Sequence, residues 1–202
     1  MTIEKGQAWG EPAPLPPDGV ISRSDAEAGA AVATARREGR DIPVIGLVRG
    51  DLCRTLGGTG DVGRLRSTDA MMFPIDVGSV LLDGRHHWFV AHLVARTRAW
   101  GRIWAALNAQ WLGELNLAPR GHPDDGLLDT FDAHLGPREL LKVRARARHG
   151  AHLPHPAIGE RKVAAIEVSF ERPRRVWLDG VEMPAVRHLS VRVEPDAARV
   201  VI

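Results

Sequence analysis

The sequence has no tyrosine, one cysteine and only three lysines among its 27 basic residues. Its single thiol, on Cys53, excludes an internal disulfide and is typical of a cytoplasmic protein. The ten aromatic residues include one adjacent pair, Trp88 and Phe89, which is too little for a surface that stacks nucleic-acid bases. Because the formal net charge is only +2, a nucleic-acid partner is not expected.

Long apolar runs are also missing. No stretch is long enough to cross a bilayer, and the first residues, MTIEKGQAWGEPAP, do not have the pattern of a signal peptide. We therefore expect a cytoplasmic protein with at most peripheral membrane contact. A chain of 202 residues with 44% hydrophobic residues can still bury a substantial core. Four prolines within residues 1–17 predict an extended arm before that core.

Residues 18–69 have the pattern of a small α/β segment. Ser24 and Glu27 form a capping-box pattern before an alanine-rich helix that Gly39 ends. A short apolar strand follows at 42–47, and a second short helix is expected at 52–56. The order helix, strand, helix is typical of an α/β unit.

Residues 70–202 predict mostly β-structure with one helix, at 137–146. An Asp-Gly turn at Asp83 joins strands expected at 72–82 and 87–94. Further strands are expected at 103–109, 114–118, 127–133, 163–170, 176–178, 189–193 and 199–202. The fold class is therefore α+β, with the helices concentrated before residue 70.

Three acidic positions are candidates for function, and each has a structural alternative. The stretch His122–Asp129 carries Asp124, Asp125 and Asp129 around one glycine, so it is either a solvated turn or a site for a hard cation such as Mg²⁺. Asp179 precedes a glycine, as in an ordinary hairpin turn. Asp51 can serve simply as the N-cap of the short helix.

Histidines recur at every third position in His149, His152 and His155, which raises the question of zinc. No cysteine or fourth ligand lies nearby, and Pro154 and Pro156 break any helix that could align the rings. We do not favour a zinc site there.

Six local strings, taken in order, resemble the bacterial diacylglycerol kinase-like lipid kinases. They are Pro74–Gly78, Asn108–Gly113 with Leu117–Pro119, the acidic turn His122–Asp129, Gly150–His152 with His155-Pro156, Trp177–Gly180 with Glu182, and Val191–Asp196, which resembles the closing hairpin of that family. The resemblance covers residues 42–202. It implies an α/β nucleotide-binding lobe, a β-sandwich lobe at 70–202, and an active site between them.

The resemblance also implies roles for single residues. Asp179 would be the catalytic base, with Glu182 as a second catalytic group displaced by Val181. Asp124 and Asp125 would hold Mg²⁺. Gly50, Asp51 and Arg54 match part of the family's nucleotide signature, so they would lie near ATP. The rival register, Gly58–Asp61, leaves only 15 residues before Asp76, too few for the loop and helix of the family.

One family feature has no counterpart. The glycine-rich loop that cradles the ATP phosphates is absent, and the nearest string, Pro16-Pro17-Asp18-Gly19, begins with two residues that have no N–H to donate. We therefore expect a truncated nucleotide lobe at 18–69. Two functions remain open. One is phosphoryl transfer from ATP to a lipid or another small hydroxyl-bearing molecule, with a second copy or a partner chain completing the site. The other is a non-catalytic module that binds lipid or protein.

Overall fold

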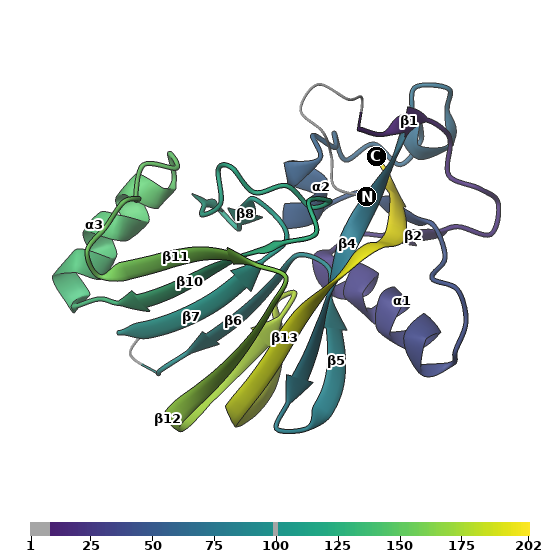
Figure 1. The fold of residues 1–202 in the computed structure, drawn as a ribbon. Helices are drawn as coiled ribbons and strands as arrows, with labels where there is room; N and C mark the ends of the chain where they lie inside the picture. Colours follow the sequence, from purple (N-terminus) through teal and green to yellow (C-terminus); the bar gives the residue numbers. More distant parts are fainter. Residues whose placement is uncertain (1–8, 99–100) are drawn as a thin grey trace.

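A computed structural model describes residues 9–98 and 101–202 (Figure 1). The first eight residues of the predicted arm lie outside this range. Its described part is extended and joined to the body: β1 (Glu11–Pro12) pairs with β4 (Met71–Leu82), and Leu15 is buried and donates its N–H to Leu65 O at 2.7 Å. The end of the arm at residue 17 stays a prediction.

The first part of the body is a small α/β unit. Strands β2 (Val20–Ser22) and β3 (Ile45–Leu47) are parallel, and β3 also pairs in parallel with the end of β13 (Val181–Val201). Helix α1 (Asp25–Arg37) begins as predicted, because Ser24 Oγ accepts from the N–H of Glu27 at 3.2 Å. Helix α2 (Asp51–Thr55) and the 3₁₀ turn η1 (Arg64–Arg66) complete the unit.

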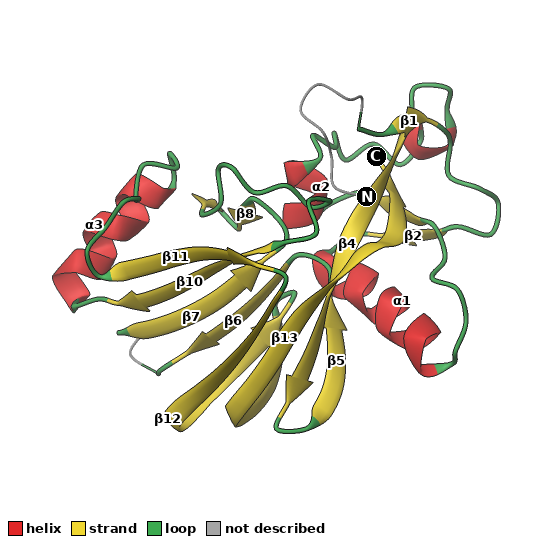
Figure 2. Ribbon diagram, viewed as in Figure 1, coloured by secondary structure: helices red, strands yellow, loops and turns green. Residues whose placement is uncertain are grey.

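The remainder is an antiparallel sheet with one helix, as Figure 2 shows. The long strands β4 (Met71–Leu82) and β13 (Val181–Val201) pair with each other, and β12 (Ala165–Leu178) follows β13 in the strand order. The other strands are β5 (Arg85–Phe89), β6 (His92–Arg96), β7 (Arg102–Leu107), β10 (Leu128–His134) and β11 (Ile158–Val163). A small hairpin, β8 (Trp111–Leu112) and β9 (Leu115–Asn116), stands apart from it. The predicted fold class, a small α/β part before a larger β-domain with one helix, is confirmed.

Several predicted strand limits are wrong. The strand expected at 87–94 breaks at Val90 and Ala91, whose N–H groups turn to the Asp179 carboxylate. The strands expected at 163–170 and 176–178 are one strand, β12. The segment Val191–Asp196, expected to form the closing hairpin, is instead part of the single strand β13. A bulge lies between Glu194 and Ala198, where β13 has more residues than the facing part of β4, and Asp196 within it takes a φ of +52°.

Hydrophobic packing divides the core into layers. One cluster lies between α1, α2 and one end of β4 and β13, and includes Val32, Leu52 and Ile75. A second joins side chains of β4, β6, β12 and β13 around Phe89 and Leu93. Helix α3 (Pro137–Ala147) lies against the other end of the sheet, beside β10 and β11 (Figure 1). None of the described helices is long and apolar enough to cross a membrane.

Replacing Gly78 with alanine tests the packing of β4. A Cβ at Gly78 would stand 2.2 Å from Phe89 Cζ, and Phe89 is fully buried. Because neither group has space to move, we expect a loss of about 1–3 kcal/mol in the free energy of unfolding, measured by urea denaturation. Gly159→Ala is the matched control, since its nearest atom would be 3.8 Å away. Equal stabilities of the two variants would contradict the packing described here.

Candidate functional site

Asp179 lies in the turn between β12 and β13, with a φ of +49°. Its Oδ2 accepts from the N–H of Val90 at 2.9 Å, and its Oδ1 accepts from those of Ala91 at 2.8 Å and His92 at 3.0 Å. Its own N–H donates to His92 O at 2.9 Å. The carboxylate thus holds the bend between β5 and β6 through three backbone donors.

Helix α1 closes the other side of this carboxylate. Gly29, in the second turn of α1, is buried, and a Cβ built on it would lie 2.5 Å from Asp179 Oδ2. Only a glycine allows the helix to approach so closely. Burial raises the pKa of Asp179 to about 6, although the His92 side chain and the three backbone donors act in the opposite direction.

Asp51 and His92 form a pair beside Asp179. His92 Nε2 lies 2.9 Å from Asp51 Oδ2, and the same oxygen accepts from the N–H of Gly113 at 2.9 Å. The carboxylate of Asp51 therefore ties α2 to the start of β6 and to the β8–β9 hairpin. Of the two side chains, that of Asp51 is 17% exposed and that of His92 only 6%.

Asp25 is the third carboxylate near His92. It is the first residue of α1, yet its side chain caps α2: Oδ2 accepts from the N–H of Asp51 at 2.6 Å and Oδ1 from that of Leu52 at 3.1 Å. Burial, the largest influence, raises the pKa of Asp25. The donors that a nucleotide phosphate could use at the start of α2 are thus already occupied by a side chain of the chain itself.

His92 balances these negative charges. Burial alone would lower its pKa, but the hydrogen bond to Asp51 and the charges of Asp179, Asp51 and Asp25 outweigh burial and raise it. The surrounding carboxylates thus favour proton binding at His92 and couple its charge to theirs.

Gly50 and Arg54 are predicted to lie near a nucleotide. Gly50 immediately precedes α2, and Arg54 lies in its last turn. Gly50 has a φ of +113°, and a Cβ there would stand 2.4 Å from Asp25 Oδ1. Arg54 stacks over Trp111, with its Cζ 3.4 Å from the ring centroid, and donates to Gly113 O at 3.0 Å. Both residues make structural contacts, and their role in nucleotide binding stays a prediction.

The acidic turn separates its two candidate Mg²⁺ ligands. Asp124 is buried, and its Oδ2 accepts from Trp9 Nε1 at 3.1 Å. Burial first, then a hydrogen bond with Asp196 and the charges of Asp196 and Asp76, raise the pKa of Asp124 to about 7. Asp76, from β4, supports the turn by accepting from the N–H groups of Gly126 at 2.7 Å and Asp196 at 3.0 Å.

Asp125 has a different partner. Lys162 Nζ, on β11, lies 2.7 Å from Asp125 Oδ2 and 3.8 Å from Asp129 Oδ2. Because Lys162 already neutralises Asp125, and Asp124 has a different partner, the two carboxylates fit a shared Mg²⁺ poorly. Their role as metal ligands stays a prediction, and no step of a reaction is derived through it.

Glu182 is not part of the Asp179 network. It lies on β13 and is exposed, and its Oε1 is 2.8 Å from Arg175 Nε and 2.7 Å from Arg175 Nη2. Its carboxylate thus forms an ion pair on the outer side of the β12–β13 pair, three residues from Asp179.

Among the described residues, one group of side chains has ligand atoms close enough to share a metal ion. It comprises Asp25, Asp51 and His92, whose candidate ligand atoms lie within 4.8 Å of one another. One imidazole and two carboxylates suit a divalent transition metal. In this structure, however, their polar atoms are directed at one another and at backbone N–H groups.

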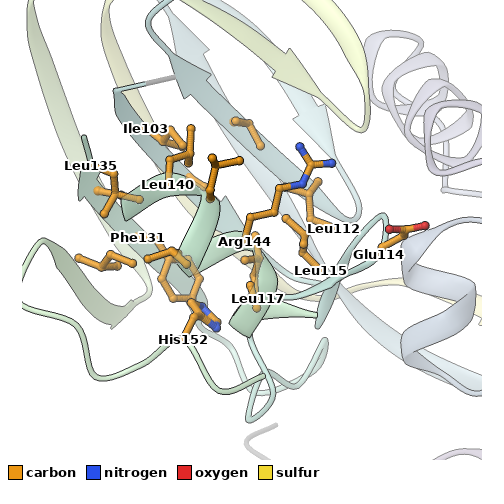
Figure 3. A pocket seen from close by; sticks show the side chains of 17 residues that line it. Ile103, Leu112, Glu114, Leu115, Leu117, Phe131, Leu135, Leu140, Arg144 and His152 are labelled. Carbon is orange, nitrogen blue, oxygen red and sulfur yellow. The ribbon is translucent and has the colours of Figure 1, made fainter. Parts of the chain in front are cut away.

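An apolar pocket of about 420 Å³ lies between α3, the β8–β9 hairpin and the sheet face formed by β6, β7, β10 and β11 (Figure 3). Its walls include Ile103, Leu117, Phe131, Leu135 and Leu140. Glu114, Arg144 and His152 are the ionisable side chains that line it. Its size is within the range of roughly 300–1,000 Å³ that is usual for small-molecule sites.

Sequence reasoning missed Asp25, His92 and His152 as members of these sites. Asp25 lies at the start of the first expected helix, and His92 lies within the strand expected at 87–94. Neither has a local pattern that reveals its partners, because Asp25 and Asp51 are 26 residues apart and His92 lies a further 41 along the chain. The sequence did bring out Asp179 and Asp51, which the fold places around His92.

Comparisons with known proteins agree with this architecture. The family described as the YegS C-terminal NAD kinase beta sandwich-like domain matches residues 75–202. No curated protein matches the chain. A solved structure described as a diacylglycerol kinase from Bacillus anthracis str. Sterne is similar over 91% of this chain and 75% of its own, with 16% identity and a TM-score of 0.65.

Another Bacillus anthracis str. Sterne structure, provisionally described as a diacylglycerol kinase, is similar over 91% of this chain and 77% of its own, with 14% identity and a TM-score of 0.67. At such low identity these two structures support the fold alone. The matched domain spans well over half of the sequence and contains Asp179, the acidic turn and the apolar pocket. The chain therefore belongs to the family described as the YegS C-terminal NAD kinase beta sandwich-like domain.

Proposed function

We propose that this protein is a non-catalytic, ligand-binding member of its family, which holds an amphipathic molecule and does not transfer phosphate to it. The observation that carries the proposal is the closed environment of Asp179. A general base must come within hydrogen-bond reach of the proton it accepts. Asp179 instead directs both oxygens at three backbone N–H groups, with the backbone of α1 against Oδ2.

The apolar pocket supports the ligand-binding half of the proposal. A sizeable concave apolar site with a few polar groups is the usual form of a small-molecule site. Leu141, on α3 at its edge, is 71% exposed, so apolar surface continues from the cavity to the outside. Such a surface favours an amphipathic ligand over a nucleotide.

One observation favours phosphoryl transfer as a second candidate. Asp51 is the most exposed carboxylate of the cluster, and its partner His92 could hold or release a proton at Nε2. If the protein is active, Mg²⁺ would supply neutralisation of the ATP phosphates. Asp51 and Arg54 would then orient the nucleotide, and a second copy of the chain or a partner chain would complete the site.

Calorimetry and thermal unfolding distinguish the two functions. We expect Mg-ATP and Mg²⁺ alone to leave the melting temperature unchanged, because Asp25 already occupies the donors at the start of α2. Decanol, as a probe of the pocket, should raise it, with a gain of about 2.7 kcal/mol in stability at a hundred times its dissociation constant. Leu141→Asp, which makes the pocket edge polar at an exposed position, should reduce that gain.

The contrary result is equally definite. Saturable Mg-ATP binding that Asp51→Ala abolishes, together with transfer of the terminal phosphate to a lipid, would overturn the non-catalytic proposal. Asp41→Ala, at an exposed aspartate, is the control for nonspecific charge effects.

A further inference from the structure

We infer that the apolar pocket takes a single-chain amphiphile whose neutral polar group, a hydroxyl or a carbonyl, hydrogen-bonds to His152. This inference rests on the proposed ligand-binding function and adds the chemical class of the ligand and the residue that recognises it. Three features carry it: the dimensions of the pocket, the lack of polar partners for His152, and the hydrogen-bonding capacity of a neutral imidazole.

The pocket is small and mostly apolar. At about 420 Å³ it lies toward the lower end of the usual range of roughly 300–1,000 Å³, which suits one aliphatic chain and not two. Figure 3 shows Ile103, Leu135 and Leu140 at one end, and His152 beside Phe131 and Leu117 at the other. A chain lying along the cavity would therefore contact hydrocarbon for most of its length and an imidazole at one end.

His152 is the unusual residue in this lining. It is 4% exposed, and neither Nδ1 nor Nε2 has a hydrogen-bond partner among the described residues. Buried polar side-chain atoms are nearly always hydrogen-bonded, and leaving one unpaired is unfavourable. Rotation about the Cβ–Cγ bond of a histidine is soft, so the ring can present a nitrogen to the pocket at small cost. A ligand with a polar group at this end would provide the missing partner.

The charge state of the ring selects the kind of polar group. Burial lowers the pKa of His152, and the charge of Glu160 opposes this only in part. The neutral ring has one donor and one acceptor nitrogen, which matches a hydroxyl group. A carboxylate placed there would have to be desolvated without a cationic partner, because Arg144, the cation of the lining, is itself exposed.

Binding of decanol and of chlorodecane provides the test, since the two differ at the end of the chain by one hydroxyl group. Their dissociation constants are measured by displacement of a fluorescent apolar probe from wild type, His152→Leu and His149→Leu. His149 is exposed and three residues away, so its variant is the matched control. Decanoate is measured in parallel, to compare a charged head group.

In wild type and in His149→Leu, decanol should bind about tenfold more tightly than chlorodecane, equivalent to ~1.4 kcal/mol. In His152→Leu the two ligands should bind equally, with chlorodecane unchanged or tighter. Equal affinities in wild type, or a decanol preference that survives in His152→Leu, would overturn the inference and leave the proposed function standing. A preference for decanoate that His152→Leu leaves intact would also overturn it. If no alkyl ligand binds, both proposals fail, whereas phosphate transfer from ATP would contradict the proposed function alone.

Discussion

Asp179→Ala should lower the free energy of unfolding by about 3–5 kcal/mol, because it leaves three buried backbone donors without an acceptor. The N–H groups of Val90, Ala91 and His92 all depend on this one carboxylate. Urea denaturation followed by circular dichroism measures the loss. A base whose role is confined to catalysis would leave stability nearly unchanged when truncated, so the size of the effect indicates what Asp179 does in the folded chain.

Asp83 provides a matched control for this variant. It also precedes a glycine in a hairpin turn, has a φ of +44°, and accepts backbone N–H groups from Arg187 and His188. Unlike Asp179 it is exposed, so water can replace its carboxylate. Asp83→Ala should therefore cost only about 1 kcal/mol. Because the left-handed backbone is common to both positions, strain at alanine cancels in the comparison. Equal losses in the free energy of unfolding for the two variants would refute the role of Asp179 as the buried acceptor of these three N–H groups.

Much of the fold follows from local patterns in the sequence. The capping pattern at Ser24 places α1, and the single helix after residue 70 is where the sequence predicts it. Strand ends were harder, because they depend on distant partners. Nothing in the sequence near Val90 reveals that the Val90 N–H donates to the carboxylate of Asp179, 89 residues later, and so takes no part in strand pairing. The bulge at Asp196 likewise reflects its contact with Asp76 on the neighbouring strand.

The sequence drew attention to several acidic residues of the candidate site, but it did not reveal what their side-chain atoms contact. Motif resemblance identified Asp51, Asp124 and Asp179, all of which are central to contacts in the structure. It assigned them to nucleotide, metal and proton transfer, roles that depend on which atoms are free. Those atoms are engaged by Trp9 in one case and by backbone N–H groups in another. Both partners come from segments distant along the chain, so the engagement of each carboxylate emerges only from the tertiary structure.

The pH dependence of stability is the second large effect that we expect. Burial raises the pKa of Asp124 to about 7, and those of Asp129 and Asp179 to about 6. In the unfolded chain an aspartate titrates near ~3.9. Between these values the folded protein binds more protons than the unfolded one, so stability must fall as pH rises. The raised pKa of His92 acts in the same direction.

We therefore expect the free energy of unfolding to fall by on the order of 5 kcal/mol between pH 5 and pH 8, with most of the change below pH 7. Urea denaturation at intervals across this range measures it. Asp124→Asn should flatten the curve, because an amide keeps the contact with Trp9 but does not titrate. Asp41→Asn, at an exposed site, should leave the curve unchanged. Stability that is constant or rises with pH would mean that the donors around these carboxylates outweigh their burial, and that the acidic turn is an ionised site able to attract a cation.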